Sequence, residues 1–226
     1  MRTARYNIYS KVHKSLRTRL LDTGLKIQIT DFSKPGTAKE TLMILKETIS
    51  SFEIHLKEDA FIFHSIASSA PYIVAMLEKE NTKNRKMSVV IAEKTERYEL
   101  LRTRTERINF GTDLQAVFFE FAAAVLHNMN REETIINELL WTNYTDNELA
   151  EMEEEIVKRL APATIGFQSM EELNTMTNIE IVKWISRLFE TATPLIAGKL
   201  MRMARSIIPP ERWDVISNNF SSKAAA

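Results

Sequence analysis

Long stretches without glycine or proline are the feature that most restricts the fold of this chain. Its 226 residues include five Gly and six Pro, and none of these falls within residues 37–70, 72–110 or 112–161. Glycine and proline commonly mark turns and helix ends, and an all-β chain carries such signals about every 8–12 residues. The spacing therefore predicts a few long helices and argues against a sheet.

Apolar residues recur every three or four positions through these stretches, which is the periodicity of a helix with one buried face. We expect helices over residues 6–24, from 37 to 66, from 71 to about 109 and from 112 to about 139. Four long helices joined by short connections predict an all-α fold, an up-down-up-down four-helix bundle. The residues expected on the buried faces are Tyr9, Val12, Leu16, Leu20, Leu42, Leu45, Ile49, Phe52, Leu56, Phe63, Ile66, Val74, Leu77, Met87, Ile91, Val117, Phe121, Val125, Ile135 and Leu139.

Helix-start signals refine the remaining boundaries. Thr112 or Asp113 is expected to cap the fourth helix. Residues 145–148 and 169–172 each carry the pattern of a capping box, and the first of these starts a shorter fifth helix. The expected organisation is a bundle that includes the start of this helix, a C-terminal helical extension packed on the bundle, and a disordered tail, over residues 1–160, 161–220 and 221–226.

Composition excludes several classes of function. The chain has no Cys, so disulfides, cysteine zinc sites and iron–sulfur clusters cannot form. Its 30 basic residues balance its 30 acidic ones, so no net charge favours nucleic acid or an anionic membrane. No apolar run approaches the roughly 20 residues that span a bilayer. The basic first 26 residues carry a helical pattern, so we expect them to belong to the fold of a cytoplasmic protein.

Candidate metal ligands are found by asking which polar residues fall on apolar helix faces. His13 shares a face with Tyr9 and Leu16, so it is expected to point inward. His55 lies among the apolar residues of the second helix, and Asp59 follows one turn later on the same face. A His and a carboxylate at positions i and i+4 present two ligand atoms to one ion from a single helix.

On the fourth helix, Asn128 and Glu132 occupy the apolar face, whereas His127 falls on the polar face. His64 has no carboxylate at ligand spacing, so neither His64 nor His127 is expected to bind a metal. A single inward His is commonly a hydrogen-bonded core residue, so a metal site requires the candidates from three helices to converge. Two buried carboxylates then need either a metal or a basic partner.

Five short segments of the chain resemble the hemerythrin-like family, which comprises four-helix bundles with a His-His-Glu cation-binding signature. The resemblance covers about residues 1–160, and its last segment fits the bacterial branch of the family. The segments are VHKSLR (12–17), HLKEDAFIF (55–63), LEKEN (77–81), NMNREE (128–133) and NYTD (143–146). The resemblance implies a hemerythrin-like bundle that holds iron between its helices.

Carried over position by position, the resemblance implies a site that keeps half of its ligands. Asn81 and Asn128 fall where the family has His, and Asn is a poor iron ligand compared with imidazole. The resemblance therefore implies at most one iron ion. The positions that keep ligand chemistry are His13, His55, Asp59 and Glu132.

Arg85 lies four residues after Asn81 and on the same helix face. We predict that its guanidinium fills the vacated ion volume as a counter-cation and pairs with Asp59 or Glu132. The alternative is an ordinary solvated arginine in a polar stretch of the helix.

Two functions are consistent with this pattern. The first is a mononuclear metal protein that senses oxygen, nitric oxide or iron, or stores iron, with a metal ion or a small gas as its partner. The second is a metal-free structural or protein-interaction module, self-associating or binding another protein, whose site is filled by Asn81, Asn128 and Arg85. No nucleophile elbow, Walker loop or dinucleotide-binding motif is present, which favours a non-enzymatic role without deciding it.

Overall fold

The computed structural model describes residues 5–159 and 173–221, and these residues form helices and no strand. The all-α prediction is therefore confirmed for the described part of the chain. The chain divides into two compact units, residues 1–156 and 157–226. No helix among the described residues is long and apolar enough to cross a membrane.

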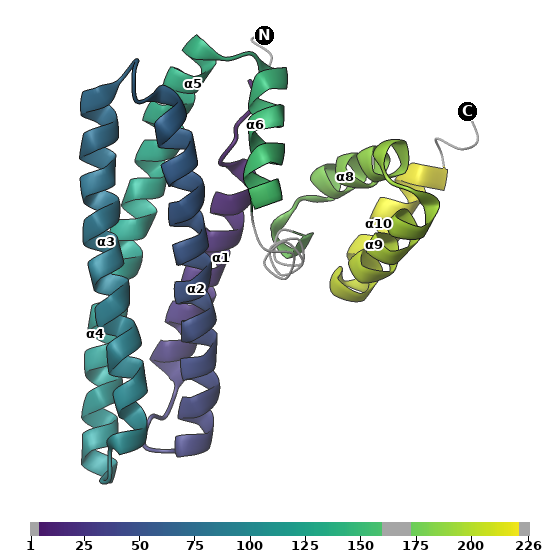
Figure 1. The fold of residues 1–226 in the computed structure, drawn as a ribbon. Coiled ribbons are helices and arrows are strands. Elements are labelled where there is room, and N and C mark those ends of the chain that lie inside the picture. The colour runs from purple at the N-terminus through teal and green to yellow at the C-terminus, as the bar shows by residue number, and fades with distance from the viewer. Residues whose placement is uncertain (1–4, 160–172, 222–226) are drawn as a thin grey trace. The chain divides into compact units, whose positions relative to one another are not determined.

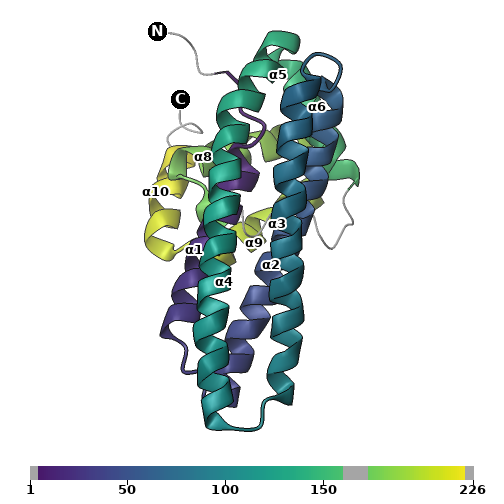
Figure 2. The same ribbon diagram turned by 90° about the vertical axis from the view of Figure 1, so that its left-hand side faces the viewer.

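Four long helices make up the first unit: α1 (Ser10–Ile29), α2 (Pro35–Ile66), α3 (Pro71–Arg97) and α4 (Arg104–Arg131). Each packs against the next, and α4 also packs against α1, so the four enclose a common core. Successive helices run in opposite directions (Figures 1 and 2). Proline occupies the first position of α2 and α3, where its missing N–H breaks no hydrogen bond.

The first helix differs from its predicted range of 6–24. It begins at Ser10 and continues through Gly24 to Ile29. Gly24 is a contact point: a Cβ atom there would lie 3.0 Å from the ring of Phe119. This glycine was expected to end the helix, whereas it permits close packing of α1 against α4.

The boundary between the third and fourth helices was also predicted wrongly. The third helix ends at Arg97, a short 3₁₀ turn η1 (Tyr98–Leu100) comes next, and α4 begins at Arg104 rather than after Gly111. Thr103, and neither Thr112 nor Asp113, caps α4: its Oγ1 accepts from the Glu106 N–H at 3.1 Å, and Glu106 Oε2 accepts from the Thr103 N–H at 2.8 Å. This capping box starts a helix without help from glycine or proline.

A layer of polar side chains divides the core of this unit into two apolar clusters. On α1, His13 lies between Tyr9 of one cluster and Leu16 of the other. On α2 and α3, polar residues likewise lie between members of the two clusters, and after α4 Glu132 lies between Met129 of one cluster and Ile136 of the other. We call this set the polar layer: His13, His55, Asp59, Asn81, Asn128 and Glu132.

The chain leaves α4 through a π-helical turn, η2 (Glu132–Ile136), and continues into α5 (Asn137–Asn143). A π turn inserts one residue relative to an α-helix and rotates the residues after it about the helix axis. Ile136 and Leu140 are accordingly buried, whereas the predicted core positions Ile135 and Leu139 are half-buried. The α-helical period therefore fails at Glu132, the last member of the polar layer.

The predicted capping box at 145–148 is confirmed. Thr145 and Glu148 exchange hydrogen bonds, with Glu148 Oε2 accepting from the Thr145 N–H at 2.7 Å, and this box begins α6 (Asp146–Arg159). The second unit contains α8 (Asn178–Thr191), α9 (Pro194–Ile207) and α10 (Pro210–Ser221) around a small apolar cluster of its own. The capping box predicted at 169–172 lies outside the described residues, as do residues 222–226 of the predicted tail.

Candidate metal centre

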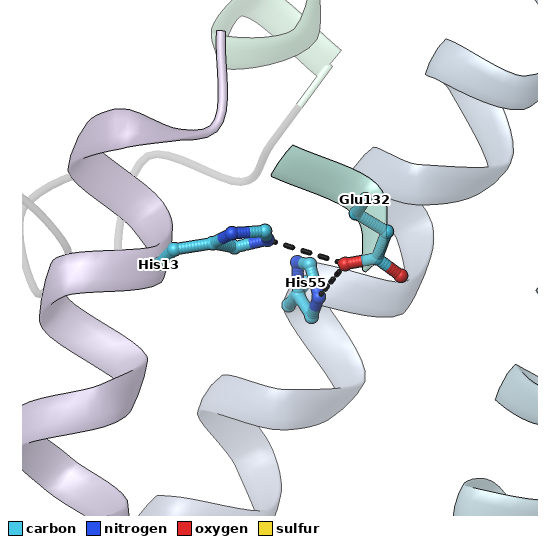
Figure 3. Close-up of side chains that lie close together, drawn as sticks. All are labelled: His13, His55 and Glu132. Atoms are coloured by element: carbon cyan, nitrogen blue, oxygen red, sulfur yellow. Dashed lines mark ion pairs between the residues drawn. The ribbon is translucent and has the colours of Figure 1, made fainter. Parts of the chain in front are cut away.

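Three side chains from separate segments meet in the polar layer. His13 comes from α1, His55 from α2, and Glu132 is the first residue of η2 (Figure 3). Their exposed fractions are 0%, 2% and 0%. The Nε2 atoms of His13 and His55 lie 3.3 and 3.4 Å from the same carboxylate oxygen, Glu132 Oε2. The convergence that a metal site requires is therefore present for these three side chains.

These separations match those between ligands of one metal ion. Two ligand atoms at about 2.1 Å from an ion, with an angle of about 90–110° between them, lie about 3.0–3.4 Å apart. The three donor atoms of His13, His55 and Glu132 all lie within 4.8 Å of one another. His13 Nε2 and Glu132 Oε2 are both buried, and apart from the contacts among His13, His55 and Glu132 they have no hydrogen-bond partner within the described residues. Buried polar atoms without partners need a counterpart, and an ion between the three groups would provide it.

Asp59 adds a second carboxylate to the group. It lies one turn after His55 on α2, is 0% exposed, and its Oδ2 is 3.4 Å from His55 Nε2. Its other oxygen, Oδ1, has no hydrogen-bond partner within the part of the chain that the structure describes. The predicted pairing of His55 and Asp59 at i and i+4 is thus formed, whereas the donor atoms that lie within 4.8 Å of one another come from His13, His55 and Glu132.

Asn81 and Asn128 link the carboxylates of Asp59 and Glu132 through hydrogen bonds. Asn81 Nδ2 donates to Asp59 Oδ2 at 2.9 Å, and Asn128 Nδ2 donates to Glu132 Oε1 at 2.8 Å. Asn128 Nδ2 also approaches Asn81 Oδ1 at 2.6 Å. The two amides therefore occupy one oxygen of each carboxylate and orient the remaining oxygens, as outer partners of metal ligands do.

Glu133, which the sequence pattern did not single out, contacts the second ring nitrogen of His13. Its Oε1 lies 2.8 Å from His13 Nδ1 and also accepts from Arg17 Nη2 at 2.8 Å. A carboxylate at Nδ1 favours a proton on that nitrogen, which would leave Nε2 available to a metal ion. The adjacent carboxylates of Glu132 and Glu133, the first two residues of the π turn, were the available signal.

Tyr9 covers the centre from the side of the apolar cluster to which it belongs. Its ring stacks on the His13 ring with 4.6 Å between centroids, and its hydroxyl is buried without a hydrogen-bond partner among the described residues. Burial, followed by the charges of Asp59 and Glu132, raises the pKa of this hydroxyl well above its usual value. Tyr9 therefore remains a neutral donor beside the centre.

Charge in the centre is distributed unequally between the carboxylates. Burial opposes ionisation of Glu132, but its contacts with His13 and His55 outweigh this effect and lower its pKa to about 2. Burial raises the pKa of Asp59 well above its usual value, and the charge of Glu132 adds to that shift. Burial also lowers the pKa of His55, which favours the neutral imidazole that binds metals.

The prediction for Arg85 is wrong. Its side chain is 52% exposed, and its Nε lies 3.2 Å from Glu53 Oε2 at the surface rather than beside Asp59 or Glu132. Long polar side chains extend to water when a surface carboxylate is in reach, so the helical position alone did not bring the guanidinium inward. His64 and His127 are exposed, in agreement with their exclusion as ligands.

Comparisons with known proteins identify no family for the chain. The sequence matches no protein-family model, and searches of curated proteins and of solved structures give no match. Any function must therefore be inferred from the geometry of the polar layer.

Proposed function

We propose that the protein is a hemerythrin-like, non-haem metal-binding protein that holds one divalent ion with His13, His55, Glu132 and Asp59. The observation that supports the proposal is the position of the first three residues. They are buried and come from separate helical segments, and the Nε2 atoms of His13 and His55 lie 3.3 and 3.4 Å from Glu132 Oε2. A fully buried Asp and Glu side by side are costly without a cation, and no Lys or Arg pairs with either of them within the described residues.

Iron(II) is the ion we propose first. Two imidazoles with carboxylate oxygens suit non-haem iron(II), while zinc and manganese also accept such ligands. A single ion is proposed because Asn81 and Asn128 offer amides where a second pair of imidazoles would be needed. Iron(II) with open coordination positions binds small diatomic molecules, which supports a role as a sensor of oxygen or nitric oxide or as an iron store.

The chain's own residues would prepare the centre in three ways. Glu133 holds the His13 tautomer, the two asparagines orient the carboxylates, and the apolar clusters on either side exclude water. Excluding water strengthens the attraction between a cation and buried carboxylates, because the local dielectric constant falls.

A metal-free interaction module is the second candidate. The observation that favours it is the amide network, because Asn81 and Asn128 each donate to one of the two buried carboxylates. In that case the polar layer would be a buried structural network, and the function would reside at the surface. The surface position of Arg85 weakens this candidate, because the guanidinium then supplies no charge to the two carboxylates.

Metal-dependent stability distinguishes the two candidates. A ligand that binds only the folded state at about 100 times its Kd stabilises it by about 2.7 kcal/mol, or about 5–10 °C in Tm for a unit of this size. We expect anaerobic iron(II) to raise the Tm of the wild type and of His127→Gln, whose imidazole is exposed. His13→Gln should abolish the shift. Equal melting curves for the wild type with and without iron(II), zinc or manganese would support the metal-free module.

A further inference from the structure

A cleft of about 300 Å³ opens on the surface of the bundle between α2 and α3. Its walls combine apolar residues of one helix with polar residues of the other. The lining includes Leu56, Ala60, Phe63, Glu78, Asn81 and Thr82. A space of this size holds about ten water molecules, at about 30 Å³ each.

Asn81 separates this cleft from the buried carboxylates. It lines the cleft and is half-buried, and its Nδ2 donates directly to Asp59 Oδ2 at 2.9 Å. Its Oδ1 lies 2.6 Å from Asn128 Nδ2, so the amide joins the two sides of the polar layer. At this point the side chain of Asn81 therefore lies between the cleft and Asp59.

The other members of the polar layer do not reach the surface in this way. His13, His55 and Asn128 are 0%, 2% and 4% exposed, and apolar clusters lie along the bundle axis on both sides of the layer. Protein interiors are close-packed, so they do not admit a hydrated ion without local opening. Asn81 needs only a rotation about its side-chain bonds.

The chemistry of the cleft suits a cation. The Glu78 carboxylate and the Thr82 hydroxyl line it together with the Asn81 amide. Arg85 also lines it, but its guanidinium is directed to Glu53 at 3.2 Å, which balances its charge. Oxygen ligands that replace water one at a time lower the barrier for an ion entering a buried site.

We propose that this cleft is the entrance through which a divalent cation reaches and leaves the metal centre, and that Asn81 is its gate. The inference rests on the proposed metal binding and adds the route and the residue that controls it. When the Asn81 amide rotates outward, Asp59 Oδ2 loses its donor and faces the cleft. When the amide returns, it restores the hydrogen bonds to Asp59 and Asn128 and closes the route.

A route has a kinetic signature that a binding residue lacks. Obstructing the only pathway slows entry and exit by the same factor, so the equilibrium Kd does not change. Ala60 is exposed and lines the cleft, so Ala60→Trp places an indole in the opening and leaves the four proposed ligand side chains unchanged. Thr82→Trp obstructs the cleft from α3 and serves as a second variant if the first one misfolds. Ala123→Trp, at an exposed position of α4 away from the cleft, is the matched control.

The test measures Co²⁺ uptake by stopped-flow visible absorption and Co²⁺ release into excess EDTA, in the full chain. We expect Ala60→Trp and Thr82→Trp to slow both rates at least about fivefold while Kd stays within about twofold, and Ala123→Trp to behave as the wild type. Wild-type rates in both obstructed variants would overturn the entrance. Failure of the wild type itself to bind Co²⁺ or iron(II) would instead refute the proposed metal binding.

Asn81→Ala separates gating from positioning. A gate variant should take up and release Co²⁺ faster, each by about tenfold, because the closed state is lost. If Asn81 only oriented Asp59, release would accelerate while uptake stayed at the wild-type rate, and the gate would be refuted.

Discussion

Replacing Asp59 by Asn should stabilise the metal-free protein and weaken its metal binding at the same time. Asp59 is 0% exposed, and Asn81 is the donor to its carboxylate. Burying a carboxylate costs several kcal/mol, and a hydrogen bond to a charged group returns about 1.5–3 kcal/mol. Asn keeps the shape, accepts the same bond through its carbonyl oxygen, and removes the charge. We expect a net gain of about 2 kcal/mol, or about 4–8 °C in Tm.

The gain should depend on pH in a defined direction. Burial raises the pKa of Asp59 in the folded state, so its favourable contribution is complete below the unfolded pKa of about 3.9 and is lost as the pH rises through the folded pKa. The difference in unfolding free energy between Asp59→Asn and the wild type should therefore be smallest near pH 4 and increase toward neutral pH.

Urea unfolding of the metal-free proteins at several pH values measures this difference, and iron(II) titration measures the metal effect. Asp113→Asn is the matched control, because that carboxylate is 67% exposed and pairs with Lys94 at 3.5 Å; a surface pair contributes about 0–1 kcal/mol. An Asp59→Asn protein less stable than the wild type at pH 7 without metal would refute the reasoning. So would a gain that does not change with pH.

Four further substitutions test the buried Tyr9 hydroxyl, the packing at two helical glycines and the surface position of Arg85. Tyr9→Phe removes a buried hydroxyl without a hydrogen-bond partner among the described residues and should stabilise the metal-free protein by up to about 1–3 kcal/mol in urea unfolding. Gly111→Ala puts a Cβ 2.5 Å from the Phe32 ring, so we expect a loss of about 1–2 kcal/mol, whereas Gly36→Ala has no atom within 4 Å and should be neutral or slightly stabilising. Arg85→Ala should cost less than about 1 kcal/mol by thermal melting; a loss of about 3 kcal/mol would indicate an internal counter-cation after all.

The sequence was most informative where a helical period acts alone. The i and i+4 spacing of His55 and Asp59, and the inward face of His13, result from 3.6 residues per turn, and the structure shows both. The same period failed after Glu132, because a π turn shifts the buried face by one residue, to Ile136 and Leu140. Hydrophobic periodicity does not report such an insertion before the partner helices are known.

The predicted helix boundaries were wrong for a different reason. The prediction ended helices at glycines, but Gly24 and Gly111 lie inside helices where aromatic rings approach the backbone closely. The true start of α4 is marked by Thr103 and Glu106, a pattern present in the sequence but placed in a stretch without glycine or proline. The position of Arg85 could not be read from its helix face, because a long side chain chooses between the interior and a surface carboxylate.

Metal content per chain tests the central proposal most directly. Untagged protein expressed with added iron would be analysed by mass spectrometry for bound metal, beside His55→Ala and the control His64→Ala, an exposed histidine of the same helix. We predict about one ion per chain for the wild type and for His64→Ala, and none for His55→Ala. Metal-free wild-type protein, or the same metal content in His55→Ala, would contradict the proposal.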